Sequence, residues 1–376
     1  MQTVAEPATS PNPGARPSAL LASHLPSLDG MRAVSILLVI VAHASDVLGR
    51  QNDYFFALGQ LGVSVFFVIS GLLITWLMIR ERDATGAFSL RYFYIRRFLR
   101  ILPVFWLLIL TVSVLKITHV ISIEWLDIVR ALTFTHNYPL SMHRPDNYAF
   151  WLTHTWSLSL EEQFYLVWPS LFAFLRPKHA ARLAAALAIA GPVLRIVNYY
   201  AFPSLRGLAG IAFQTRIDIL MAGCASAFLL ESPAWRARIR KIPVWPTLTA
   251  TSLFLFFADP FFTNHFAFHS RADAIVRLIF PTFEALAIAF TLLVVVAGKP
   301  GLAYRALNWR VSTHIGKLSY SLYIWQQLFL PRDIAASIFS LLWRLAAAYL
   351  VALCSFRFVE RPLLKLRSRF RQGVAV

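Results

Sequence analysis

The chain has 376 residues, of which 58% are hydrophobic and only 14% are charged. A soluble domain usually carries about a quarter of its residues as charged ones, so this composition excludes an ordinary soluble protein. The formal net charge is +18, but the basic residues cluster in short connections between long apolar stretches. Membrane topology and attraction to anionic lipid headgroups explain this distribution, so no nucleic-acid partner is expected.

Ten apolar stretches approach the roughly 20 residues that a helix needs to cross a bilayer. They lie at 31–49, 59–79, 98–117, 155–175, 183–201, 213–231, 244–259, 273–297, 314–330 and 337–357. The seventh stretch is the weakest of these. The sequence therefore predicts an all-α integral membrane protein with a bundle of about ten transmembrane helices.

Basic residues are concentrated in every second connection, which sets the predicted orientation. The rich connections lie at 80–100, 176–182, 236–241 and 299–317. The positive-inside rule then places the N- and C-termini in the cytoplasm. We expect a disordered cytoplasmic arm at 1–27, a membrane domain at 28–362 and a basic cytoplasmic tail at 363–376. No cleavage site follows the first stretch, which is expected to be retained as a signal anchor.

The first apolar stretch contains a cation and an imidazole, Arg32 and His43. Their spacing of eleven residues corresponds to about three helical turns, so both side chains face the same way, with roughly 16 Å of helix axis between them. Ionisable groups in a membrane are costly and usually face a cavity or the bundle interior. His43 is therefore a candidate site residue. The alternative is that Arg32 anchors the helix at the interface and His43 is a packing histidine.

Further charged residues are expected at the depth of His43. Glu161 and Glu162 lie near the start of the fourth stretch, and Arg216 and Asp218 lie near the start of the sixth. A carboxylate beside a neutral histidine fixes its tautomer and stabilises the imidazolium, as a general base requires. The alternative is a buried ion pair of Arg216 and Asp218 that only fixes helix packing.

Other potentially reactive residues are given structural roles. No serine lies in a nucleophile-elbow pattern, so no covalent serine intermediate is predicted. Ser70, in the middle of the second stretch, is expected to permit close helix packing. Cys224 and Cys354 both lie within apolar stretches, so neither a disulfide framework nor a metal site is predicted.

Several motifs, in this order along the chain, resemble the membrane acyltransferase 3 family. They are SLDGMR at 27–32 leading to His43, GVSVFFVISG at 62–71, RRFLRILP at 96–103, TWSLSLEEQFY at 155–165, RID at 216–218, SYSLYIW at 319–325 and ERP at 360–362. Each motif is weak alone, but the ordered set extends over most of the chain.

The resemblance implies a polytopic O-acyltransferase that moves an acyl group, usually acetyl, from cytoplasmic acyl-CoA to a hydroxyl of a cell-envelope or exported glycan at the outer side. His43 would be the catalytic base, oriented by Glu161 or Glu162. The donor would be bound by Arg32, Arg96 and Arg97, although these arginines also serve as topology signals. Acetyl-CoA, or another acyl-CoA, is then a substrate, and no permanently bound cofactor or metal is expected.

The polar cavity is expected to be completed by Arg216, Asp218, Ser70, Tyr320 and Gln326. Family members often have histidine directly after the tryptophan of the SYSLYIW motif, whereas this chain has Gln326 there. Glutamine donates and accepts hydrogen bonds but carries no proton at neutral pH, so Gln326 is expected to position a ligand or a water.

The expected location is the cytoplasmic (inner) membrane of a bacterium. Some family members carry a soluble hydrolase-like domain after the last helix. Since none is evident here, acyl handling is expected within the membrane domain or with a separate partner. An alternative from another class is a transporter or flippase whose buried charges relay protons. No internal repeat is evident, which weakens that alternative.

Overall fold

A computed structural model describes residues 25–50, 53–138, 150–203, 206, 211–265, 270–331, 337–367 and 370. All regular structure in these residues is helical, which confirms the predicted all-α class. The predicted arm, up to residue 24, and most of the predicted tail lie outside the described residues.

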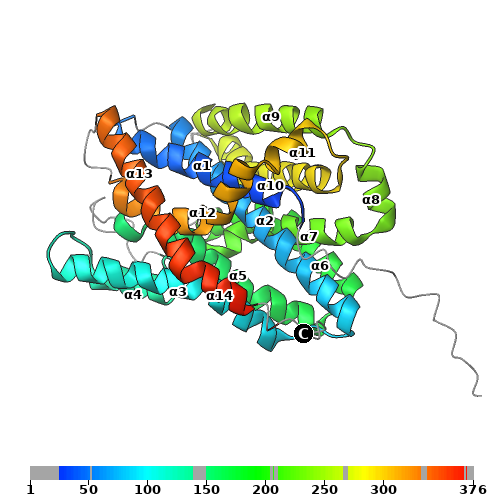
Figure 1. Ribbon diagram of the computed structural model, residues 1–376. Helices are drawn as coiled ribbons and strands as arrows, with labels where there is room; N and C mark the ends of the chain where they lie inside the picture. Colours follow the sequence, from blue (N-terminus) through cyan, green and yellow to red (C-terminus); the bar gives the residue numbers. More distant parts are fainter. Residues whose placement is uncertain are drawn as a thin grey trace, which may run out of the picture.

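The helices follow one another in a single bundle (Figure 1). They are α1 (Leu28–Val47), α2 (Asp53–Thr85), α3 (Leu90–Ile117), α4 (Trp125–Leu132), η2 (Phe150–Leu152), α5 (Thr155–Phe174), α6 (Pro177–Ala201), α7 (Phe213–Glu231), α8 (Pro233–Ile239), α9 (Val244–His265), α10 (Arg271–Ala297), α11 (Leu302–Leu307), α12 (Arg310–Phe329), α13 (Ile338–Ser355), η4 (Phe356–Glu360) and α14 (Arg361–Arg367).

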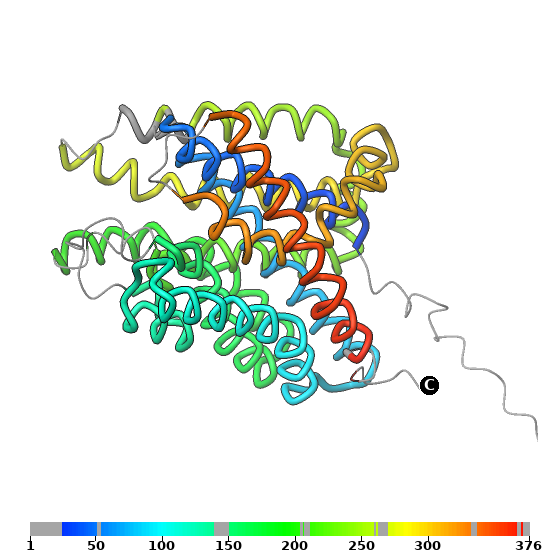
Figure 2. The backbone as a smooth tube through the Cα atoms, turned by 60° about the vertical axis from the view of Figure 1, so that its left-hand side comes forward, coloured from blue at the N-terminus to red at the C-terminus, as the bar shows by residue number. Residues whose placement is uncertain are grey.

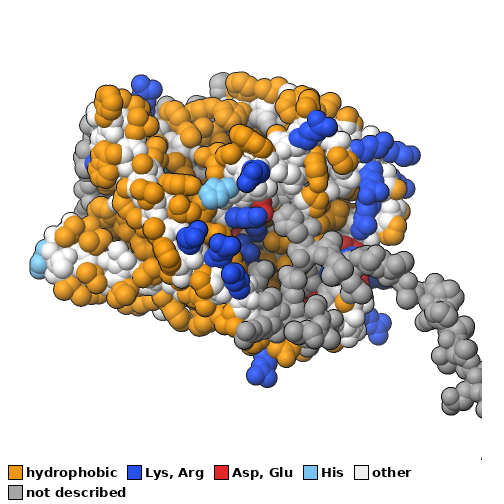
Figure 3. Space-filling view, viewed as in Figure 1, with side chains coloured by type: hydrophobic (Ala, Val, Ile, Leu, Met, Phe, Trp, Pro, Cys, Tyr) orange, Lys and Arg blue, Asp and Glu red, His pale blue; other side chains and the backbone are white. Residues whose placement is uncertain are grey.

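Among the described residues, seven helical segments are long and apolar enough to cross a membrane. They are α1, α2, α3, α6, α7, α10 and the continuous segment Ile338–Leu366. The other three predicted stretches coincide with α5, α9 and α12. The hydropathy of α5 and α12 is lowered by polar residues that the bundle buries, and the apolar part of α9 is shorter, Val244–Ala258. Large apolar side chains cover much of the visible surface (Figure 3).

The bundle is built around α2, which packs against α1 on one side and against α7 on the other. Helices α9 and α3 lie at opposite edges, and α13 crosses the bundle obliquely, in two views turned by 60° (Figures 1 and 2). Glycines permit the close approach of α2 and α7. A Cβ atom added at Gly71 would lie 2.0 Å from the carbonyl oxygen of Leu220, and one added at Gly223 would lie 2.2 Å from that of Val68.

A buried ion pair joins α6, α7 and α10. Nη2 of Arg195 lies 3.0 Å from Oδ2 of Asp218, and both side chains are at most 2% exposed. The same guanidinium donates hydrogen bonds to the carbonyls of Leu278 at 2.6 Å and Thr215 at 2.7 Å. Thr282 donates a further hydrogen bond to the carboxylate at 2.5 Å. The network fully surrounds both charges with polar partners, which is the condition for placing them in an apolar interior.

We expect Gly71→Ala and Gly223→Ala each to lower the thermal unfolding temperature of the detergent-solubilised protein. The added methyl group would meet backbone atoms that no rotamer change can move, and overpacking of this kind costs about 1–3 kcal/mol. Gly301→Ala is the control, because a Cβ atom there has no neighbour within 4 Å. Unchanged unfolding of both test variants would contradict the close contact of α2 and α7.

Asp218→Ala is expected to destabilise the fold by about 3–5 kcal/mol, because it leaves the buried Arg195 guanidinium without its counter-charge. The measurement is the unfolding temperature of purified protein, with Asp83→Ala on the exposed surface of α2 as the control. The double variant Arg195→Met with Asp218→Leu removes both charges and should recover most of the loss. If the double variant is as unstable as the single one, the ion pair is not the cause.

Candidate active site

A cavity lies between α1, α2, α3, α5 and α12, with about 750 Å³ of empty space that includes its opening to solvent. Its charged lining consists of the three guanidinium groups of Arg32, Arg97 and Arg100 and the carboxyl group of Glu161. The rest of the wall consists of apolar side chains, which come mainly from α2, and of hydroxyl groups, which come mainly from α5 and α12. Cationic groups therefore outnumber the carboxylate in this lining, and the cavity suits a ligand with an anionic part and an apolar part.

The polar groups of this cavity are connected to one another. Oγ of Ser70 donates a hydrogen bond of 2.6 Å to Oε1 of Glu161, and the Tyr165 hydroxyl lies 3.5 Å from the same serine oxygen. The guanidinium of Arg97 lies over the Tyr165 ring, 5.2 Å from its centroid. Arg32 pairs with Asp29 one turn earlier on α1, at 3.4 Å. The arginines are thus held in place by α1, α3 and α5.

His43 lies farther along α1, roughly 16 Å from Arg32 along the helix axis, and it is not part of the cavity lining. Its Nδ1 is 2.8 Å from Oε1 of Gln326 on α12. Tyr323 lies between the cavity and His43. It lines the cavity, its ring contacts that of His154, and it lies one helical turn before Gln326 on α12. Its hydroxyl donates a 2.8 Å hydrogen bond to the His154 carbonyl.

His154 directly precedes α5, and its ring packs against Tyr323, which lies one helical turn before Gln326, the partner of His43. Burial, then the neighbouring His43 and His136, lowers the pKa of His154 to about 3. Burial, and then Arg130, likewise lowers the pKa of His136 to about 4. Both rings are therefore neutral at physiological pH. The sequence alone indicated no role for His154 in the site.

The two carboxylates predicted to orient His43 are found elsewhere. Glu161 is bonded to Ser70 inside the cavity. Glu162 does not line the cavity, and its buried Oε1 has no hydrogen-bond partner in the described part of the chain. The reason is the depth of Glu161 in the bundle. The first residue of α5 lies near the level of His43, and Glu161 lies about 10 Å beyond that residue along the helix axis. Nδ1 of His43 is paired with the amide of Gln326.

Three other predicted residues do not line the cavity either. Arg216 donates a 2.9 Å hydrogen bond to Gln60 and lies over the Trp156 ring. Asp218 belongs to the buried ion pair with Arg195 rather than to a pair with Arg216. Arg96 is 2.5 Å from Oε2 of Glu81 and donates to the Phe370 carbonyl.

Five of the predicted residues do line the cavity, namely Arg32, Ser70, Arg97, Glu161 and Tyr320. The hydroxyl of Tyr320 donates a 2.7 Å hydrogen bond to the Ile101 carbonyl, which ties α12 to α3. Arg100 also lines the cavity, although it was not one of the arginines singled out for the donor; its three-residue spacing from Arg97 places both on one face of α3. In the described residues, no group of three or more His, Cys, Asp or Glu is arranged to hold a metal ion.

Comparisons with known proteins agree with this arrangement of a membrane enzyme. The peptidoglycan O-acetyltransferase OatA of Listeria monocytogenes is 28% identical over 374 residues, which cover 91% of this chain and 56% of that protein. The O-acetyltransferase OatA of Staphylococcus aureus is 28% identical over 365 residues, with 91% and 57% covered. The chain thus spans less than three fifths of the length of these relatives. No solved structure matches. The sequence model of an acyltransferase domain matches residues 25–356, so the chain belongs to the acyltransferase 3 family.

Proposed function

We propose that this protein is a membrane O-acetyltransferase that moves an acetyl group from acetyl-CoA to a hydroxyl of a cell-envelope glycan. The observation that carries the proposal is a cavity lined by three guanidinium groups, with an imidazole just beyond its other end. The name of the Listeria relative makes peptidoglycan the first acceptor to test. The donor and its entry from the cytoplasm are part of the proposal.

The donor is assigned to the cavity. Arg32, Arg97 and Arg100 supply the charge that coenzyme A phosphates need, and guanidinium groups bind phosphates by paired, charge-assisted hydrogen bonds. The apolar wall from α2 suits the uncharged arm that joins the phosphates to the thioester. This arm would extend from the Arg32 end of the cavity toward Tyr323 and His43.

The base is assigned to His43. Nδ1 of His43 lies 2.8 Å from Oε1 of Gln326, which accepts, so this pairing requires the tautomer with the proton on Nδ1 and the lone pair on Nε2. Nε2 removes the proton from the acceptor hydroxyl while the oxygen of that hydroxyl attacks the thioester carbonyl. The new carbon–oxygen bond forms, the carbon–sulfur bond breaks, and the proton passes from the imidazole to the leaving thiolate.

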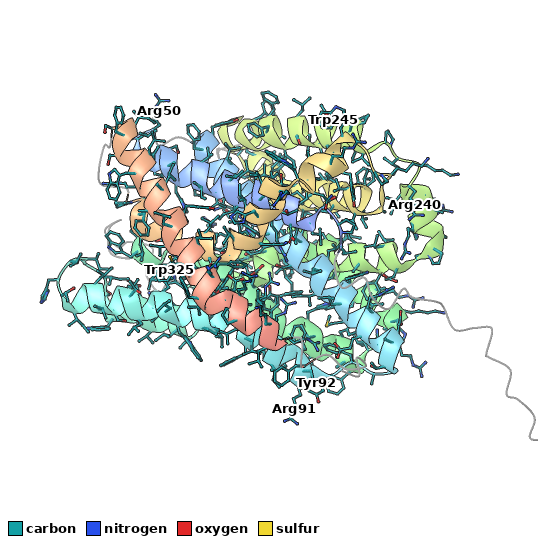
Figure 4. The ribbon with its side chains drawn as sticks, in the orientation of Figure 1. Arg50, Arg91, Tyr92, Arg240, Trp245 and Trp325 are labelled. Carbon is teal, nitrogen blue, oxygen red and sulfur yellow. The ribbon has the colours of Figure 1, made fainter. Side chains whose placement is uncertain are left out.

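We also assign ten spans to the helices, with α5, α9 and α12 added to the seven apolar ones, and we place the Arg32 end of the bundle at the cytoplasmic side. The distribution of positive charge supports this orientation. Arg91 and Arg240 come from basic connections and lie toward one end of the bundle, whereas Arg50 lies at the other (Figure 4). With the bacterial relatives, this orientation favours the cytoplasmic membrane of a bacterium.

His43→Ala is expected to lower acetyl transfer by about 100-fold or more, because general-base catalysis contributes on the order of 10²–10⁴. The measurement uses membranes with matched protein amounts, radiolabelled acetyl-CoA and the glycan fraction, and it also records the release of free CoA. His314→Ala, an exposed histidine on α12, is the control. Label without CoA release would contradict the donor, and equal label in the His43 variant would contradict the base. Transport of a solute without consumption of acetyl-CoA would favour the transporter alternative.

Arg97→Ala is expected to raise the KM for acetyl-CoA by about 10- to 100-fold, because a hydrogen bond to a charged group contributes about 1.5–3 kcal/mol. Arg96→Ala is the matched control, since this neighbouring arginine is bound to Glu81 and lies outside the cavity lining. Initial rates measured at varied acetyl-CoA concentration and a fixed acceptor concentration give the KM of each variant. A larger effect for Arg96 than for Arg97 would place the donor outside this cavity.

A further inference from the structure

Two buried side chains beside His43 carry polar nitrogens that have no hydrogen bond within the described residues. His154 is 4% exposed, and neither ring nitrogen makes a hydrogen bond of normal geometry, although the backbone of Ile324 lies nearby. Gln326 is 1% exposed, and its Nε2 is likewise unpaired. Most buried polar groups in proteins are paired, and an unpaired one costs about 1–3 kcal/mol. Two unpaired polar groups next to a proposed catalytic base indicate that a ligand supplies the missing hydrogen-bond partners.

The two side chains are held in place although their nitrogens are not used. The His154 carbonyl accepts hydrogen bonds from the Tyr323 hydroxyl at 2.8 Å and from Oγ of Ser157 at 3.1 Å. The imidazole packs against the Tyr323 ring, with 5.5 Å between the ring centroids. Gln326 follows Tyr323 by three residues on α12, so both lie on one face of that helix. The N-terminal end of α5, α12 and α1 thus bring His154, Gln326 and His43 together.

The chemistry of these groups defines the ligand class. His154 stays neutral because burial, and then its histidine neighbours, lowers its pKa to about 3. One ring nitrogen is therefore a donor and the other is an acceptor, while Nε2 of Gln326 is a donor. Neither His154 nor Gln326 contributes a negative charge, and together they offer both donors and an acceptor beside the imidazole of His43. Adjacent oxygens of a sugar ring, which both donate and accept, match this set.

We propose that His154 and Gln326 form the acceptor subsite, in which they bind two neighbouring oxygens of a sugar residue so that one hydroxyl faces Nε2 of His43. This proposal rests on the proposed function, because it divides the reaction between a donor cavity and a separate acceptor site. Tyr323 stands at the border between them, lining the first and holding His154 in the second.

His154→Phe tests the subsite sharply. Phenylalanine keeps a ring against Tyr323 and leaves the backbone carbonyl contacts in place, but it removes both ring nitrogens. If His154 only packs, this change is neutral or stabilising, because it removes buried unpaired polar atoms. If His154 binds the acceptor, affinity for the sugar falls while the fold is retained. His136→Phe is the matched control, since His136 is partly buried and also neutral but its Nδ1 is paired with Oγ1 of Thr155 at 2.9 Å.

The probe is chitotetraose, a soluble tetramer of N-acetylglucosamine. Its equilibrium binding to the purified full chain is measured by tryptophan fluorescence without donor, and its KM is measured in acetyl transfer from acetyl-CoA. We expect His154→Phe to weaken chitotetraose binding and raise its KM by at least about tenfold, corresponding to 1.4 kcal/mol. The Kd of acetyl-CoA should stay within about twofold of the parent value, since Arg32, Arg97 and Arg100 are unchanged. His136→Phe should match the parent in chitotetraose binding and KM.

The outcomes separate this proposal from the proposed function. A parent that binds chitotetraose and loses that binding on His154→Phe, but releases no CoA, leaves the subsite standing and removes the transferase. A parent that transfers acetyl, with a His154→Phe variant that folds and matches it in chitotetraose binding and KM, overturns the subsite and retains the transferase. Equal weakening of acetyl-CoA and chitotetraose binding would also overturn the subsite, because it would place His154 at the donor.

Discussion

The cost of holding polar groups in an apolar interior determines how this bundle is built. Where no water is available, each charge or amide needs a partner from another helix, and such partners fix how helices pack. Arg195 and Asp218 meet this requirement completely, with two carbonyls and a hydroxyl added to their ion pair. They stabilise the packing of α6, α7 and α10. Unpaired nitrogens at His154 and Gln326 are departures from the same rule, and they lie beside His43.

Helix α1 carries both halves of the candidate site, and its length sets the distance between them. Arg32 contributes to the cavity and His43 lies about three turns away, so one rigid element fixes the separation of the cavity arginine from the imidazole. The other helices serve one half each: α3 supplies Arg97 and Arg100, whereas the part of α12 after Tyr323 supplies Gln326. Under the proposed function, the thioester has to reach past Tyr323 to meet the acceptor.

The sequence was informative about features set by periodicity and composition. It predicted the all-α class, the presence of Arg32, Arg97 and Glu161 among polar groups facing the interior, and a hydrogen-bonding role for Gln326. It placed Glu161 or Glu162 beside His43, whereas the structure pairs Glu161 with Ser70 and Nδ1 of His43 with Gln326. A depth estimated from span boundaries cannot resolve the roughly 10 Å that separates the start of α5 from Glu161. The partner of Asp218 was equally beyond reach, since pairing across α6 and α7 depends on helix rotation, which a single sequence does not specify.

A neutral amide beside His43 constrains the proposed chemistry. A carboxylate partner would stabilise an imidazolium before the acceptor attacks, whereas Gln326 can fix the tautomer but adds no charge. In a low-dielectric interior, the positive charge that forms on His43 attracts the negative charge that develops on the thioester oxygen. Proton removal is thereby coupled to attack on the bound donor. A catalyst built in this way needs donor and acceptor together, and it leaves the acceptor hydroxyl protonated while the cavity is empty.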